Sequence, residues 1–256
     1  MTNATLLELL GFVIILFSAA LMAGLAALRR KSPPAFREIP AFSRLRQAIG
    51  RVVENGTRLH VSLGRGALVT AQSASAMSGL TLLRRLAELT SAGDQPPVAT
   101  SGDAALAILS QDTLQTASQA SAQGVYDPTA GRLTGLTPFS YAAGAIPVIR
   151  DENISTNVLM GNFGVEAALL AEAAERDNTF TLAASDNLTA QAVLYASAQE
   201  PLIGEELYAA GAYLDAGPTH TASLTVQDVL RWLIIIAILA GALLQLVQLL
   251  LSAGAQ

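Results

Sequence analysis

The chain has 256 residues, of which 52% are hydrophobic, and a formal net charge of −5. It contains no cysteine and only two histidines, which excludes disulfides, thiolate nucleophiles and metal sites built from cysteine or several histidines. The sequence therefore predicts no metal site.

Two apolar segments enclose the rest of the chain. After a short uncharged start, residues 1–5, the run Leu6–Leu28 carries Glu8 as its only charge and ends at a basic cluster. As a helix it reaches roughly 34 Å, enough to cross a hydrocarbon core of roughly 30 Å. A second run, residues 230–251, precedes the short end 252–256. These patterns predict two transmembrane helices that flank a basic juxtamembrane segment (29–58), a middle domain (59–216) and a linker (217–229).

The charges are divided unevenly along the chain. Residues 29–65 hold nine Lys and Arg against two Asp and Glu, a net +7, whereas residues 66–256 hold six against seventeen, a net −11. By the positive-inside rule, both termini lie outside and the middle domain is cytoplasmic. The basic segment is suited to anionic lipid headgroups, and the acidic body disfavours nucleic acid as a partner. The residues expected at the membrane surface are Arg29, Arg30, Lys31, Arg44, Arg46, Arg51 and Trp232.

Small and amide side chains recur within the two apolar runs. Ala20 with Gly24, and Ala237 with Gly241, have the four-residue spacing that lets helices approach closely. Gln245 and Gln248 place amides in the second run, where such groups seek a hydrogen-bond partner on another helix. These residues could pack the spans within one protomer or between protomers.

The middle segment alternates helical and β-rich stretches. An amphipathic helix is expected from Pro40 to a stop at Asn55-Gly56. Four units follow, each a short β-rich run, a turn of small polar residues and a helix. Their β-rich runs are 59–63, 97–100, 156–160 and 179–183. An extended run is expected over Tyr141–Arg150, and a final helix over Gly204–Ala212. Strands that alternate with helices predict an α/β fold, a Rossmann-like and mostly parallel sheet built from two βαβ halves.

The candidate binding residues follow the predicted strands. In an open α/β sheet, ligands bind at the carboxyl ends of the strands, near helix N-termini. The side chains expected there are those of Arg65, Ser101, Asp103, Asn162 and Asp186. Arg65 could hold a phosphate or a carboxylate, or it could pair with Asp103. Turn formation and helix capping explain the same residue types equally well. No dinucleotide, Walker or nucleophile-elbow motif is present, so no catalytic residue and no cofactor is assigned.

Several stretches resemble one known family. PPVATSGDAALAILSQDTL, GRLTGLTPFSYAAG, ASDNLTAQAVLYASAQEPLIGEELYAAGAYL and QDVLRWLIII are similar to segments of an uncharacterised group of bacterial two-span membrane proteins. The group is known only as a domain of unknown function, and the resemblance covers most of residues 36–240. It implies a shared architecture in the bacterial inner membrane, and it supplies no activity or functional residue.

Three hypotheses follow from these patterns. The leading one is a membrane-anchored scaffold that forms a homo-oligomer or a subunit of a complex with other membrane proteins. The second is a sensor that binds a small anionic ligand or a nucleotide at the strand ends. The third is a membrane-associated hydrolase or transferase, and the lack of a catalytic motif makes enzymatic activity the weaker expectation.

Overall fold

The computed structural model describes residues 3–29, 36–70, 73–120 and 126–253. The chain divides into two compact units. One unit is the domain Arg37–Ala216, and the other is formed by the two terminal segments, Met1–Phe36 and Gly217–Gln256.

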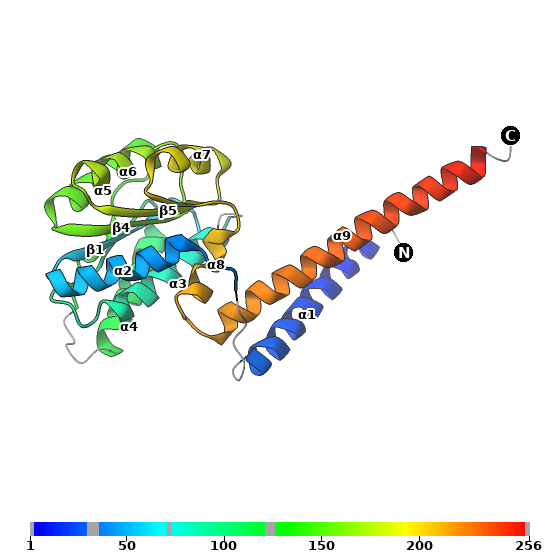
Figure 1. Cartoon of the computed structure of the whole chain (residues 1–256), viewed down its shortest axis with the longest axis horizontal. Helices are drawn as coiled ribbons and strands as arrows, with labels where there is room; N and C mark the ends of the chain where they lie inside the picture. Colours follow the sequence, from blue (N-terminus) through cyan, green and yellow to red (C-terminus); the bar gives the residue numbers. More distant parts are fainter. Residues whose placement is uncertain (1–2, 30–35, 71–72, 121–125, 254–256) are drawn as a thin grey trace. The chain divides into compact units, whose positions relative to one another are not determined.

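The domain is built on one sheet of six parallel strands (Figure 1). The strands are β1 (Arg58–Gly64), β2 (Val98–Ser101), β3 (Gly131–Leu133), β4 (Ile154–Asn162), β5 (Phe180–Ser185) and β6 (Glu200–Leu202). Their order across the sheet is β3-β2-β1-β4-β5-β6. The register of the sheet places Val61 of β1 beside Ala99 of β2 on one side and beside Val158 of β4 on the other. The predicted α/β fold with a parallel sheet between two apolar helices is confirmed, and each βαβ half contains a third strand.

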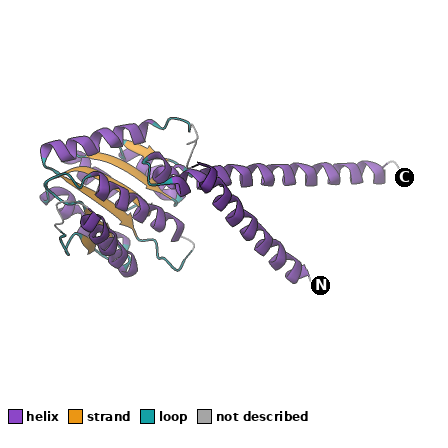
Figure 2. Cartoon of the chain, turned by 90° about the horizontal axis from the view of Figure 1, so that it is seen from below, coloured by secondary structure: helices purple, strands orange, loops and turns teal. Residues whose placement is uncertain are grey.

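Helices cover both faces of this sheet (Figure 2). One face carries α2 (Pro40–Asn55), α3 (Ser73–Leu89), α4 (Ala104–Ala120) and α8 (Glu206–Tyr213). The other carries α5 (Pro138–Asp151), α6 (Ala167–Arg176) and α7 (Leu188–Ser197). Along β1, Leu59, Val61 and Leu63 join the core beneath the first group of helices. Because side chains alternate along a strand, His60 and Ser62 point to the opposite face.

The amphipathic helix α2 follows its sequence pattern closely. Proline stands at its first turn, and Phe42, Leu45, Ile49 and Val52 are buried on one side. Gly56 ends the helix in the left-handed conformation, with φ of 61° and its N–H directed to the carbonyl of Val52. The sequence pattern thus places this helix on the sheet, where its apolar side joins the main core.

The extended run expected over Tyr141–Arg150 is wrong, because this stretch lies within α5. Thr137 and Ser140 form a capping box ahead of Tyr141, with Pro138 in the first turn. The buried residues Tyr141, Ala142, Ala145 and Ile149 then follow at helical spacing. β-branched residues such as those around Pro147 are common in strands, but here the cap and the periodicity of burial determine the helix. The final helix starts slightly later than expected, as α8, and most of the expected linker 217–229 belongs to the last helix.

The terminal unit consists of two long helices. These are α1 (Asn3–Arg29) and α9 (Pro218–Ala253), and they pack against each other. Each is long and apolar enough to span a membrane, over Glu8–Leu28 and Pro218–Gln248. Figure 2 shows them diverging toward their free ends. The 36 residues of α9 reach roughly 54 Å, which exceeds the hydrocarbon core, so part of this helix must lie outside it.

Candidate functional site

The strand order creates a switch point between β1 and β4. These neighbouring strands lead to helices on opposite faces, since α3 follows β1 and α6 follows β4. In open α/β sheets, such divergence opens a crevice at the carboxyl ends of the strands, where ligands bind. The candidate residues from the sequence all lie at this carboxyl edge.

Backbone hydrogen bonds join the strand ends at the switch point. The N–H of Arg65 donates to the carbonyl of Asn162 over 2.8 Å, and the N–H of Gly102 donates to the carbonyl of Gly64 over 2.8 Å. Gly64 has φ of 70°, and a Cβ there would overlap the Asn162 carbonyl. Only glycine fits here, so the turn after β1 is held against the end of β4.

Arg65 pairs with a residue that the sequence did not single out. Its Nε donates to Oε1 of Glu166 over 3.2 Å, and the Glu166 side chain is only 1% exposed. The same oxygen accepts the N–H of Gly164 over 3.0 Å. The expected alternative partner, Asp103, instead accepts the N–H of Leu106 at the start of α4. The Arg65 charge is therefore balanced by a buried carboxylate.

The remaining candidates also bond within the protein. Asn162 donates its amide to one oxygen of Asp186 over 2.7 Å, and Ser75 donates to the other oxygen over 2.8 Å. The Ser101 hydroxyl donates to the carbonyl of Asp103 over 3.1 Å. The structure thus brings Asn162 and Asp186 into direct contact and gives Ser101 and Asp103 a local structural role. Together with Arg65 and Glu166, the edge carries one guanidinium and three carboxylates, a balance that disfavours an anion.

A buried polar layer lies beneath this edge. His60 contacts Oδ1 of Asn157 at 2.7 Å through Nδ1 and Oγ1 of Thr100 at 2.9 Å through Nε2. Burial lowers the pKa of His60 to about 4, so the ring is neutral at physiological pH. The ring is enclosed and both of its nitrogens are bonded, which leaves it unsuited to act as a general base for a bound substrate.

Tyr141 connects this layer to the switch point. Its hydroxyl bonds the hydroxyl of Ser62 and accepts the N–H of Gly64 over 3.3 Å. Burial raises the pKa of Tyr141, which keeps the phenol protonated. Tyr141 lay in the segment read as a strand, so its role was missed. The signal available in the sequence was the capping pattern Thr137-Pro138-Phe139-Ser140 before it.

Exposed apolar side chains follow several strands at the carboxyl edge. Val69 follows β1, Leu136 and Phe139 follow β3, and Leu188 follows β5, with Leu188 80% exposed. The carboxyl edge therefore carries exposed apolar side chains, in loops and at the starts of α5 and α7, as well as polar groups that bond one another.

Two of the three arginines of α2 that were expected to face lipid form ion pairs within the domain. Arg44 pairs with Glu200, and Arg46 pairs with Asp215 over 2.9 Å, although both side chains remain more than half exposed. Arg51 is exposed on the same helix, and Trp232 is exposed on α9. The side chains of the cluster at 29–31 lie outside the described residues.

The small-residue faces of the spans do not meet within one chain. Ala20 and Gly24 on α1 are exposed, as are Ala237 and Gly241 on α9. Among the residues that the structure describes, no other helix or side chain comes within 4 Å of where a Cβ of Gly24 or Gly241 would lie.

The two amides of α9 have no partner along the described chain. Gln245 and Gln248 are exposed, and neither side chain makes a hydrogen bond with the residues that the structure describes. Packing of these amides within one protomer or between protomers stays a prediction.

Pockets occur at the opposite, amino edge of the sheet. One of about 130 Å³ lies between α3, α4 and the segments before β2 and β3. Another of about 370 Å³ lies between α2 and the starts of β4 and β5. Among residues 3–29, 36–70, 73–120 and 126–253, no group of three acidic or histidine side chains could hold a metal ion.

Comparison with known proteins identifies the family. The model of the domain of unknown function DUF6754 matches residues 3–255, so the chain belongs to this family. No similar protein was found among curated proteins, and no similar fold among solved structures.

Proposed function

We propose that this member of the DUF6754 family is a membrane-anchored scaffold, in which the apolar helices of several copies associate and hold their α/β domains together. The observation that carries the proposal is the exposure of Gln245 and Gln248 on the apolar part of α9. An amide that faces lipid loses the hydrogen bonds it makes with water, so it gains by bonding an amide of another helix.

The open small-residue faces support the same arrangement. Gly24 and Gly241 leave room for the backbone of a neighbouring helix, and α1 does not fill that room. In a membrane, close packing and interhelical hydrogen bonds drive helix association, because lipid tails are as apolar as the helices themselves. Both observations concern surfaces that one chain leaves uncovered.

The distribution of charge gives the proposed orientation. The basic residues 29–65 follow the first span, which favours a cytoplasmic domain and external termini in a bacterial inner membrane. Arg231, beside Asp228 at the domain-proximal end of the second span, is consistent with the same orientation. Anionic headgroups are the lipid partners that such a segment favours.

The experiment measures exchange between labelled copies in lipid vesicles. Because the chain has no cysteine, Ala92→Cys, an exposed position in the loop after α3, accepts one donor or acceptor dye per chain. Resonance energy transfer should appear when the two labelled pools are mixed in one membrane. Gln245→Leu with Gln248→Leu should weaken association about five- to thirtyfold, the effect of losing about 1–2 kcal/mol. Gln47→Leu, an exposed amide on α2, is the matched control and should change nothing. Equal transfer in the double variant and in the control contradicts the role of the amides.

Ligand binding at the carboxyl edge is a second candidate, favoured by the strand order. The switch point between β1 and β4 is where Rossmann-like domains bind their ligands. The acidic balance of Asp103, Glu166 and Asp186 against Arg65 favours a neutral or cationic ligand over the anionic one expected from the sequence. Arg65→Ala should reduce stability, because it leaves the buried carboxylate of Glu166 without its partner. Unchanged stability would instead indicate that Arg65 serves a ligand.

A further inference from the structure

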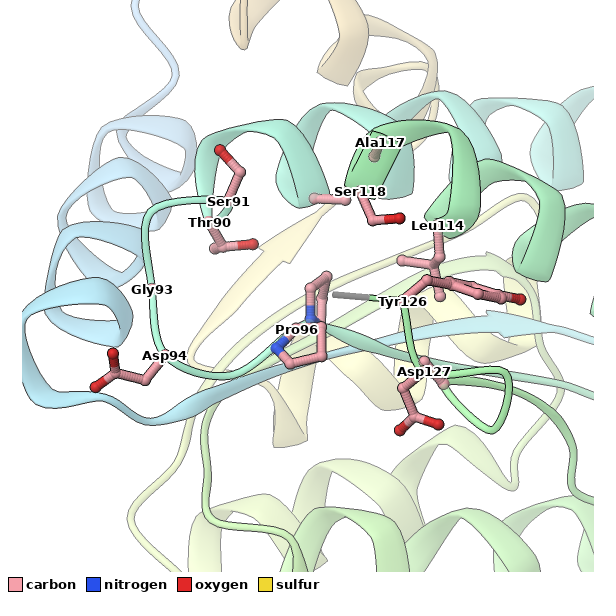
Figure 3. A pocket seen from close by; sticks show the side chains of 13 residues that line it. Thr90, Ser91, Gly93, Asp94, Pro96, Leu114, Ala117, Ser118, Tyr126 and Asp127 are labelled. Carbon is pink, nitrogen blue, oxygen red and sulfur yellow. The ribbon is translucent and has the colours of Figure 1, made fainter. Parts of the chain in front are cut away.

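The two pockets at the amino edge of the sheet differ in the hydrogen bonds that their side chains already make. Figure 3 shows the smaller pocket, of about 130 Å³, with Thr90, Ser91 and Ser118 around it. The hydroxyls of these three residues donate to carbonyls of α3 or α4 over 2.8–2.9 Å. Asp127, also at this pocket, lies 3.5 Å from Arg58. Most of the polar side chains at the smaller pocket therefore bond within the protein.

The larger pocket, of about 370 Å³, lies between α2 and the starts of β4 and β5. Its volume falls within the range of roughly 300–1,000 Å³ that is typical of ligand pockets. The side chains that line it include Arg51 and Asn55 of α2, Asn178 and Phe180 at the start of β5, and Gln199 just before β6. All of these except Phe180 are exposed, so the pocket is open to solvent.

Four polar side chains at the larger pocket have no partner among the described residues. The guanidinium of Arg51 and the carboxamides of three residues make no hydrogen bond or ion pair with any residue that the structure describes; the three are Asn55, Asn178 and Gln199. A carboxamide both donates and accepts hydrogen bonds, and a guanidinium offers five N–H donors. A ligand whose groups both donate and accept therefore suits these side chains.

The charges beside the larger pocket cancel. Arg51 is the one charged side chain among the described residues that line it, and Glu54 lies one helical turn from Arg51 on α2. Two more carboxylates next to the lining amides, those of Asp177 and Glu200, each pair with another arginine. A ligand therefore gains little from a net charge of either sign.

Three helix C-termini oppose an anion at the larger pocket. α2 ends at Asn55, α6 ends two residues before Asn178, and α7 ends two residues before Gln199. The carbonyl groups at a helix C-terminus carry partial negative charge. They disfavour an anion beside Arg51, and Arg51 itself disfavours a cation. An uncharged ligand is therefore favoured.

Phe180 gives the larger pocket an apolar surface. Its side chain is partly buried, packs against the main core and borders the pocket. A pyranose sugar has C–H groups on the faces of its ring and hydroxyls around its rim, and each hydroxyl both donates and accepts hydrogen bonds. One such ring can contact Phe180 with a face while its hydroxyls reach the surrounding amides.

We propose that the larger pocket binds a neutral hexose. One face of the sugar ring lies on Phe180. The sugar hydroxyls bond the carboxamides of Asn55, Asn178 and Gln199, and the guanidinium of Arg51 donates to hydroxyl oxygens. The pocket lies at the edge of the sheet opposite the switch point, so it adds a ligand to the proposed scaffold without involving the carboxyl edge.

The experiment uses the full-length chain in phosphatidylcholine nanodiscs, with empty nanodiscs as the blank and without detergents that carry a sugar headgroup. The probes are methyl α-D-glucopyranoside, methyl α-D-mannopyranoside and methyl α-D-galactopyranoside, each tested by saturation-transfer NMR. At least one should receive saturation from the protein, and an equal concentration of inorganic phosphate should not displace it. The proposal is overturned if none of the three probes binds, or if phosphate displaces the bound sugar.

Two pairs of variants locate the binding. Asn178 and Asn153 are both exposed and have φ of 52° and 55°, which glycine accepts, but only Asn178 lines the pocket. Asn178→Gly should weaken sugar binding about three- to tenfold, the effect of one lost hydrogen bond, and Asn153→Gly should not.

The second pair removes exposed glutamines. Gln199→Ala should weaken sugar binding by a similar factor, whereas Gln47→Ala, on α2 outside the pocket, should leave it unchanged. All four variants should keep the wild-type Tm, because these side chains are exposed. Sugar binding that is unchanged in Asn178→Gly and Gln199→Ala, or equally reduced in their controls, refutes the site.

Discussion

The hydroxyl of Tyr141 offers a direct test of how the carboxyl edge is held together. The side chain is fully buried, and its hydroxyl bonds Ser62 and the N–H of Gly64. In Tyr141→Phe both partners remain buried without that oxygen. An unsatisfied buried group costs about 1–3 kcal/mol, and the removal of the buried phenol hydroxyl offsets part of it. We expect the free energy of unfolding of the domain to fall by about 2 kcal/mol.

The assay must report on the domain and not on the spans. Trp232, the only tryptophan, lies in α9, whereas the five tyrosines all lie between residues 126 and 213. Near-ultraviolet circular dichroism during thermal unfolding therefore follows the domain. For a domain of this size, a loss of about 2 kcal/mol lowers Tm by about 4–8 °C.

Tyr195→Phe provides the control, since this side chain is 71% exposed. It should leave the free energy of unfolding within about 0.5 kcal/mol of wild type. If Tyr141→Phe falls in the same range, the hydroxyl does not support the edge and the reasoning is refuted.

Three further predictions concern the buried layer, strand packing and topology. The folded pKa of His60, about 4, lies below its usual 6.5, so the unfolded chain binds the proton more readily; stability should fall by about 3 kcal/mol as pH drops from 6.5 to 4. His60→Gln should flatten that slope in pH-dependent urea unfolding, and an unchanged slope contradicts the assignment. Gly161→Ala should cost about 1–3 kcal/mol, because a Cβ there overlaps the carbonyl of Leu63, whereas Gly50→Ala in α2 meets open space and should stabilise the domain slightly. Finally, Ala92→Cys should react with an impermeant maleimide in inverted vesicles but not in intact cells; the reverse pattern places the domain outside.

Local patterns in the sequence predict the central strands and most helices. The runs that became β1, β2, β4 and β5 are β-rich and are bounded by turn residues, so their positions follow from neighbouring residues alone. The amphipathic pattern of α2 is equally local. These elements were sufficient to predict a parallel α/β sheet.

The parts that were missed depend on contacts between distant residues. The strands β3 and β6 have three residues each, and β3 is defined by its pairing with β2, as in Ala99 beside Gly131. The ion pair of Arg65 with Glu166 joins residues 101 positions apart. Nothing near Arg65 in the sequence selects Glu166 over Asp103. The carboxyl edge could therefore be located from the sequence, but the pairing of its charges could not.

The mass of the wild-type particle in lipid nanodiscs tests the proposed scaffold most directly. One chain has a mass of 26.5 kDa. Native mass spectrometry should find a fixed multiple of this mass, two copies or more, and Gln245→Leu with Gln248→Leu should shift the distribution toward single chains. A particle of one chain at every protein-to-lipid ratio contradicts the association of the spans on which the proposed function depends.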